Sequence, residues 1–215
     1  MNKYVVYTSV FGKYDKFPYI EKEEGIDYIL FTPEEIKSDN MWNVIKVDRE
    51  FKDDSKNSRI YKLLPHLFLS SYEQSCWVDA DLKFEFKLLN LFKSFKYFLC
   101  FCHPNKVLTY QEEGRRCISK NKETKEKIEH QIEFYSKFNI DTNFKKILAG
   151  FFLMRSHNNT EVIRFNNEWF SHIASMGKRD QISLEFLRNK YFPFFNIDTI
   201  DSNYIIKKIG HRLRK

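Results

Sequence analysis

Short apolar runs alternate along this chain with segments of helical periodicity, and that alternation is the strongest constraint on its fold. Six runs rich in β-branched and aromatic residues predict strands, at residues 4–11, 26–32, 42–47, 75–84, 95–103 and 147–155. Helices are predicted at residues 56–71, 112–138 (as one or two helices), 160–177 and 179–189. This order favours an α/β layered fold with a mainly parallel sheet in its first half, in which ligands bind beyond the carboxyl ends of the strands.

The size of the chain limits how many domains it can form. It has 215 residues, of which 42% are hydrophobic, and this supplies the core of one domain but falls short of two. Pro65 lies inside the helix predicted at 56–71. Because proline lacks a backbone N–H and clashes with the preceding turn, we expect the helix to be kinked or divided there.

The net charge is +7, and the lysines and arginines are spread along the sequence. A basic chain is expected to have an anionic partner, such as a nucleic acid, a nucleotide or an anionic membrane, although a lysine-rich solvated surface is the plainer alternative. The sequence contains no RNP, zinc-finger or homeodomain pattern. We therefore expect no nucleic-acid partner.

Cysteine usage and hydropathy predict a cytoplasmic location. The four cysteines include no CxxC pair, which favours free thiols in a reducing compartment over a structural zinc site. No apolar run approaches the ~20 residues of a membrane span, and the N-terminus enters a predicted strand rather than a signal peptide. Residues 204–215 mix apolar and basic side chains, which is typical either of a short amphipathic helix resting on anionic lipid or of a solvated tail.

Two aspartates, Asp79 and Asp81, are the candidate chemical centre. If the strand predicted at 75–84 continues through both, their side chains share one face while Val78 and Ala80 point to the core. Two convergent carboxylates suit Mg²⁺ or Mn²⁺ and leave coordination positions for phosphate oxygens. The alternative is a half-exposed strand with its acidic residues outward.

A basic stripe precedes this pair. Arg59, Lys62 and His66 recur at i, i+3 and i+7 of the predicted helix, a spacing that could grip a diphosphate or simply form a solvated helix face. The sequence has no P-loop, GxGxxG, HExxH or GxSxG motif. The leading prediction from the residues is therefore a phosphate-bearing substrate that is bound through a metal ion.

Several sequence blocks, taken in order, resemble a known family. The blocks are YTSVFGKYD (7–15), DYILFT (27–32), SRIYKLLPHLFL (58–69), CWVDADLKF (76–84), CHPNK (102–106), IEHQIEFY (128–135), AGFFLMRSHN (149–158) and NNEWFSHIASMGKRDQISLEF (166–186). They are similar to a glycosyltransferase-like family that was first catalogued as a domain of unknown function and occurs in bacterial surface-polysaccharide loci and plant Golgi proteins. The resemblance implies a GT-A (Rossmann-like) fold, with a nucleotide-sugar half at residues 1–105 and an acceptor half at 106–215.

The same resemblance implies roles for individual residues. Nucleotide-sugar binding falls to Thr8, Gly12, Asp15, Arg59, Lys62 and Asp79. Metal binding falls to Asp79 and Asp81, and by looser analogy to His211, for which a solvated tail histidine is the alternative. Asp180 and Gln181 would act at the reacting sugar. The residues on the acceptor side would be His103, Glu112, Gly150 and Arg179. Asp180 is also a good N-cap for the following helix. Ala149 stands where the family usually has the first of two glycines.

The implied activity is transfer of a sugar from a nucleoside-diphosphate sugar to a glycan or lipid-linked acceptor, with Mn²⁺ or Mg²⁺ as cofactor. The setting would be capsule or lipopolysaccharide synthesis, with peripheral contact between the basic C-terminus and an anionic membrane. Asp180 would act as the base if the enzyme inverts, and Asp180 or Gln181 would steady the sugar if it retains. Two other classes stay open: a non-catalytic binder of nucleotide sugars or glycans, and a nucleotidyl- or phosphotransferase that uses the same acidic pair.

Overall fold

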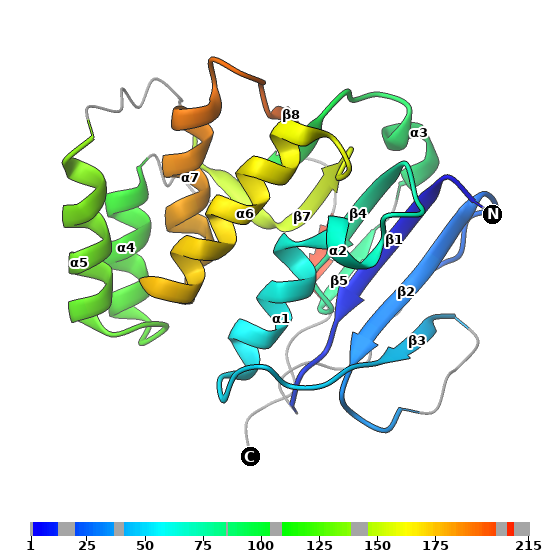
Figure 1. Ribbon diagram of the computed structural model, residues 1–215, viewed down its shortest axis with the longest axis horizontal. Helices are drawn as coiled ribbons and strands as arrows, with labels where there is room; N and C mark the ends of the chain where they lie inside the picture. Colours follow the sequence, from blue (N-terminus) through cyan, green and yellow to red (C-terminus); the bar gives the residue numbers. More distant parts are fainter. Residues whose placement is uncertain are drawn as a thin grey trace.

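A mixed but mainly parallel sheet forms the centre of the molecule (Figure 1). The computed structural model describes residues 2–12, 20–36, 41–84, 86–103, 109–138, 146–200 and 206–208, and within these ranges seven strands pair in the order β3-β2-β1-β4-β7-β6-β8. The strands are β1 (Tyr4–Ser9), β2 (Ile26–Thr32), β3 (Asn43–Lys46), β4 (Gln74–Val78), β6 (Phe98–Cys102), β7 (Leu148–Arg155) and β8 (Asp198–Ile200). β7 runs antiparallel to both of its neighbours, and every other pairing is parallel.

The helices begin where the sequence supplies caps. They are α1 (Asp54–Leu63), α2 (Pro65–Phe68), α3 (Leu88–Phe92), α4 (Tyr110–Ser119), α5 (Lys125–Ser136), α6 (Thr160–Ser175) and α7 (Asp180–Tyr191). The Asp53 carboxylate accepts from the backbone N–H of the second residue of α1, and Asn159 caps α6 in the same way. Pro65 divides the predicted helix into α1 and α2, as expected.

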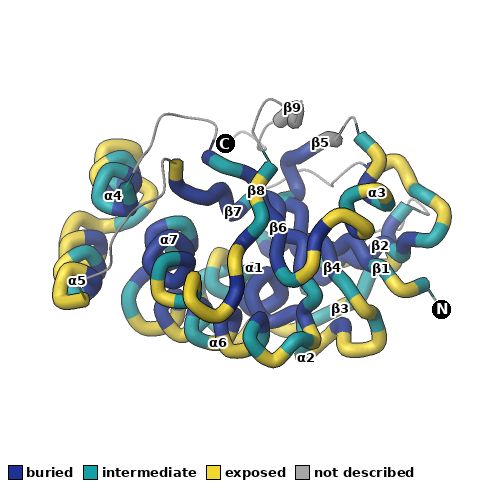
Figure 2. Tube along the Cα trace, turned by 90° about the horizontal axis from the view of Figure 1, so that it is seen from above, coloured by how far each residue is buried: buried dark blue, intermediate teal, exposed yellow. Residues whose placement is uncertain are grey.

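Two apolar clusters lie on opposite faces of the sheet. One contains Tyr7 and Trp77 and packs against α1, α6 and α7, and the other contains Val6 and Val78 and packs against α3. Figure 2 shows the buried strands running between α2 and α6 on one side and α3 on the other. The α/β, mainly parallel fold predicted from the alternation of elements is thereby confirmed, and the charged stretch at 112–138 forms two helices, α4 and α5.

Two predicted elements were wrong over part of their length. The strand predicted at 75–84 is interrupted after Val78 and resumes as β5 (Leu82–Phe84). Residues 206–208 form strand β9 (Ile206–Lys208), which pairs antiparallel with β5, so the amphipathic helix considered for 204–215 is wrong there. The other residues of that stretch lie outside the described ranges. None of the helices in those ranges is both long and apolar enough to span a membrane.

Candidate active site

The acidic pair lies in a turn rather than on a strand face. The Asp79 N–H donates to the carbonyl of Phe151 at 2.9 Å, and the Asp79 carbonyl accepts from the N–H of Leu82 at 3.2 Å. This closes a four-residue turn directly after β4, so the prediction that the Asp79 and Asp81 side chains alternate onto one strand face is wrong. The Asp79 side chain is 37% exposed, whereas Asp81 is only 4% exposed. Ala80 is buried, as expected.

Trp77 orients the first aspartate. Its indole N–H donates to Oδ1 of Asp79 at 2.8 Å, and the Lys62 ammonium lies 3.5 Å from the same oxygen. The ammonium also lies 5.6 Å from the centre of the Trp77 ring, within cation–π range. No role at the site was predicted for Trp77 from the sequence. Its position two residues before Asp79 in the predicted strand was the signal that could have placed it there.

Lys62 joins this turn to the start of α7. Its Nζ lies 2.6 Å from Oδ2 of Asp180, and the Nε of Arg59 lies 3.3 Å from the same oxygen. Arg59 and Lys62 are three residues apart on α1, so both reach the same side of the helix. We call these four residues, Arg59, Lys62, Asp79 and Asp180, the edge network. It lies where β4 ends, at the edge of the sheet where the ligands of such folds bind.

The charges of the edge network are largely withdrawn from water. The Lys62 and Asp180 side chains are only 2% and 5% exposed. Burial alone would raise the pKa of the Asp180 carboxyl, but the positive charges of Arg59, Lys62 and Arg179 hold that pKa well below its usual range. Asp180 is therefore a fixed anion and a poor proton acceptor, and this geometry disfavours the base role considered for it. It is the first residue of α7 and makes no side-chain cap there.

Gly150 allows β7 to approach this ion pair closely. A Cβ on Gly150 would lie 3.2 Å from Oδ2 of Asp180 and 3.4 Å from Nζ of Lys62, which is tighter than ordinary van der Waals contact. The neighbouring Ala149 is fully buried in the core, so the absence of a first glycine leaves the close approach at Gly150 intact.

The residue after Asp180 contacts the backbone of β7. The amide of Gln181 donates to the carbonyl of Leu148 at 3.3 Å, and the N–H of Leu148 donates to the Glu185 carboxylate at 3.1 Å. These bonds set α7 against the start of β7, which places Asp180 beside Gly150. Gln181 thus has a structural contact at the position where a role at the sugar was predicted.

The loop after β1 lies against α1. Gly12 has a φ of +70°, and an added Cβ would lie 2.5 Å from the Asp54 carboxylate, so only glycine fits without rearrangement. Two serines missed by the sequence analysis meet here: Ser9 at the end of β1 donates to Ser58 of α1 at 2.9 Å. Thr8 is fully buried on the other face of β1. Asp15 lies outside the described residues.

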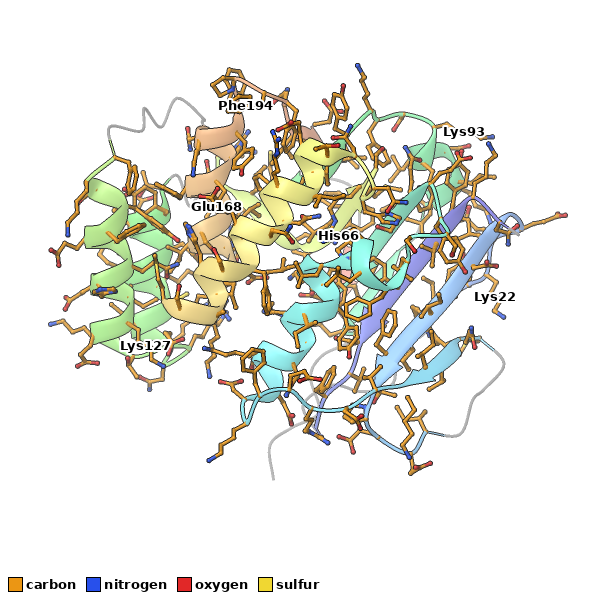
Figure 3. The ribbon with its side chains drawn as sticks, in the orientation of Figure 1. Lys22, His66, Lys93, Lys127, Glu168 and Phe194 are labelled. Atoms are coloured by element: carbon orange, nitrogen blue, oxygen red, sulfur yellow. The ribbon has the colours of Figure 1, made fainter. Side chains whose placement is uncertain are left out.

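His66 does not extend the basic stripe of α1. It belongs to α2, beyond the break at Pro65 (Figure 3). Burial lowers its pKa, with the positive charge of Arg155 acting in the same direction. The predicted stripe of three residues was therefore wrong at its last member, because the helix is divided at the proline.

Besides Gly150 of β7, the predicted acceptor-side residues lie directly after β6, on α4 and directly before α7. His103 follows β6, donates its N–H to the carbonyl of Ile147 at 2.8 Å, and has its ring 3.4 Å from the guanidinium of Arg116. Glu112 forms a reciprocal capping box with Thr109 at the start of α4. Arg179 directly precedes Asp180 and is half-buried.

The acidic turn contains the two aspartates that were predicted to bind a divalent ion. Within the described part of the chain, no group of three or more His, Cys, Asp and Glu side chains is arranged to hold a metal. His211, the expected late ligand, lies outside that part. Two carboxylates completed by phosphate oxygens and water are nevertheless the ligands that Mg²⁺ takes beside a nucleotide. Asp79 and Asp81 therefore stay the predicted ligands of an ion that would arrive with its substrate.

Comparison with known proteins identifies the family of this chain. No match was found among the curated proteins. The model of the TOD1/MUCI70 glycosyltransferase-like domain, however, matches residues 23–200, which include α1, the acidic turn, Gly150 and the start of α7. The chain belongs to the TOD1/MUCI70 glycosyltransferase-like family.

Proposed function

We propose that this protein transfers a sugar from a nucleoside-diphosphate sugar to a hydroxyl group of a glycan or lipid-linked acceptor. The observation that carries the proposal is the edge network, which brings side chains from α1, the acidic turn and α7 together beside Gly150. The family match makes a glycosyl-transfer role the natural one for such a site. Divalent metal dependence, with Asp81 as the main ligand and Asp79 assisting, belongs to the proposal.

The departing nucleoside diphosphate carries growing negative charge, and a bound divalent ion would neutralise part of it. The chain itself contributes fixed positive charge through Arg59 and Lys62, which the Asp180 carboxylate holds in place before the substrate arrives. Trp77 and Lys62 fix the orientation of Asp79, so that little reorganisation is needed on binding.

Asp180 acts in this mechanism as a positioning residue. A general base works best when its pKa is near the operating pH, and the pKa of Asp180 is displaced in the opposite direction. The retaining alternative requires no enzymic base at this position. We therefore assign Asp180 to hold the two cations beside the departing phosphates rather than to act as the base of an inverting reaction.

Nucleotide-sugar turnover with and without metal tests the proposal. The protein would be incubated with a panel of nucleotide sugars and Mn²⁺, with EDTA, and as the variant Asp81→Asn. We expect release of the nucleoside diphosphate with Mn²⁺ and its loss in the other two arms. Equal turnover in all three arms would exclude the metal role.

Product analysis separates the competing classes. A nucleotidyltransferase acting on a nucleotide sugar would transfer the nucleoside monophosphate to the acceptor and release sugar 1-phosphate, whereas a glycosyltransferase transfers the sugar and releases the intact nucleoside diphosphate. Binding of nucleotide sugars without any turnover across the acceptor panel would favour a binding protein. Acceptors drawn from capsule and lipopolysaccharide intermediates address the proposed role in bacterial surface polysaccharide, and association with anionic vesicles addresses membrane contact at the cytoplasmic face.

A further inference from the structure

A second group of charged side chains lies on the other side of Asp180, between α4 and the start of α7, which pack against each other (Figure 1). It consists of Arg116, Lys122 and Arg179, and we call it the basic cluster. One buried carboxylate, Glu113, lies among these cations, and its side chain is only 3% exposed.

Glu113 does not neutralise all three cations. Its Oε2 lies 3.9 Å from the guanidinium of Arg116, and its Oε1 accepts from the thiol of Cys117 at 3.4 Å. Arg179 lies near the thiol of Cys117. Its Nε is buried and has no hydrogen-bond partner, and over the described ranges no ion pair within 4.0 Å involves Arg179.

The electrostatic consequence is an excess of positive charge in a partly desolvated place. Burial lowers the pKa of Lys122, and the charge of Arg179 lowers it further. Burial lowers the pKa of Arg179, but the charges of Asp180 and Glu113, which the other cations share, raise it overall. What Arg179 lacks is a partner for its buried Nε donor, and leaving such a donor unpaired is costly. A planar guanidinium matches carboxylate and phosphate groups through paired N–H donors, so a ligand carrying such a group would offset the cost.

The position of the cluster indicates which part of a substrate it would meet. Arg179 is adjacent to Asp180 in the chain and acts electrostatically on its carboxyl. The cluster therefore borders the edge network on the side away from β1 and the loop after it, where the nucleotide is expected. The ring of His103 contacts Arg116 there as well.

We propose that the basic cluster binds an acidic group, a carboxylate or a phosphate, on one of the two sugars that meet beside Asp180. This inference rests on the proposed glycosyl transfer and names its substrate class: an acidic sugar. The group belongs either to the acceptor or to the transferred sugar of the donor, and the same residues would recognise it in both cases.

Titration with matched neutral and acidic probes tests the proposal. The acceptor arm uses glucose, glucuronate and glucose 6-phosphate, and the donor arm uses UDP-glucose and UDP-glucuronate, each with Mn²⁺ and followed by ligand-observed NMR or calorimetry. We expect at least one arm to show a preference of about tenfold or more for the acidic member, the scale of one charge-assisted hydrogen bond. The arm that shows it identifies the source of the group.

Variants tie that preference to the cluster. Arg179→Gln should remove most of it, and the exposed Lys122→Gln should reduce it several-fold. Lys125→Gln, at an exposed lysine of α5, should leave it unchanged. Thermal unfolding of each variant shows whether it is folded, and Lys122→Gln carries the test if Arg179→Gln does not fold.

Two outcomes overturn the inference: equal binding of acidic and neutral probes by the wild type in both arms, or a preference that survives in both cluster variants. Uridine diphosphate with Mn²⁺ serves as a separate reporter of the donor site. If it binds and the acidic preference is absent, the inference alone fails. If it and the nucleotide sugars fail to bind while the glucuronate preference is present and depends on Arg179, the proposed function fails and the anion site stands.

Discussion

Lys62 belongs to two networks that differ in their partners. Its ammonium enters the edge network, where two carboxylates lie within 3.5 Å and Asp79 remains open to solvent. Its carbonyl accepts instead from Arg155 at 2.6 Å, inside the core. Arg155 is fully buried and also donates to the hydroxyl of Tyr7 and to the amide oxygen of Asn166. We call Arg155, Tyr7, Asn166 and the Lys62 carbonyl the core network.

The two networks offset the free-energy cost of burying a cation in different ways. The core network surrounds one guanidinium with neutral oxygens, and it satisfies a carbonyl left without a partner where α1 ends before Pro65. The edge network pairs cations with two carboxylates, of which Asp79 is open to solvent and Asp180 is buried. The first arrangement holds the end of α1 in place, and the second uses that helix to present charge to a substrate.

Removing the guanidinium of the core network should have the largest effect on stability. Arg155→Met leaves the buried Asn166 oxygen without its guanidinium donor and the Lys62 carbonyl with only the longer bond from the Tyr7 hydroxyl at 3.3 Å. We expect the free energy of unfolding to fall by about 4 kcal/mol, since each unsatisfied buried group costs roughly 1–3 kcal/mol. Urea unfolding measures the change. An unchanged midpoint would contradict the role given to this network, and Arg155→Lys, which keeps a donor, should recover part of the loss.

Neutralising Asp180 should have the next largest effect on stability, and it should also reduce activity strongly. Asp180→Asn leaves the buried Lys62 charge with only the more distant Asp79, and should cost about 3 kcal/mol of stability. Transfer should fall roughly a hundredfold because Arg59 and Lys62 lose their anchor. The double variant with Lys62→Met should be less destabilised than the sum of the two single variants. Strict additivity would show that the pair is not coupled.

The pH dependence of that variant has a definite sign. The folded-state pKa of Asp180 is depressed, so its contribution to stability is complete above the unfolded-state value of about 4 and is lost as the pH falls below it. The stability difference between the wild type and Asp180→Asn should therefore shrink below pH 4. A difference that stays constant down to pH 2 would contradict the depressed pKa.

The pH dependence of stability that His157 causes, next to the core network, should fall in a different pH range. Burial lowers the pKa of His157 to about 4, and the charge of Arg155 contributes. Since the unfolded histidine titrates near pH 6.5 and binds more protons over this range, stability is lost as the pH falls from about 6.5 to 4, by roughly 3 kcal/mol. His157→Gln keeps an N–H donor for the Leu69 carbonyl and should show a flatter profile, measured by urea unfolding at each pH. Parallel profiles would remove His157 as the cause.

The smallest change in stability is expected at Gly150. Gly150→Ala places a methyl group 3.2 Å from the Asp180 carboxylate and 3.4 Å from the Lys62 ammonium. A shift of a few tenths of an ångström relieves this, at about 1 kcal/mol. Turnover should fall by a larger factor than stability suggests, because the displaced groups are those of the edge network. Gly177→Ala serves as a packing control, because its added Cβ would lie no closer than 3.5 Å to any neighbour. Full turnover in Gly150→Ala would show that the close approach is not required.

Local patterns predicted most of the fold. β2 and the start of α6 agree with their predicted bounds, because apolar alternation and an Asn cap are properties of a few adjacent residues. The turn at Asp79 was missed because it depends on the carbonyl of Phe151, more than seventy residues away. The pairing of β9 with β5 was missed for the same reason, since a short strand is specified by its partner as much as by its own residues.

Most residues of the candidate site could be predicted from the sequence, but the contacts between them could not. The sequence by itself determined that acidic residues follow a buried strand, that Arg59 and Lys62 share a helix side and that a proline divides that helix. Only the tertiary structure decided that Asp180 lies between Arg59 and Lys62, because this contact spans more than a hundred residues. Its carboxyl keeps its charge since three cations meet there, and no spacing in the chain reveals which distant charges will surround a buried group.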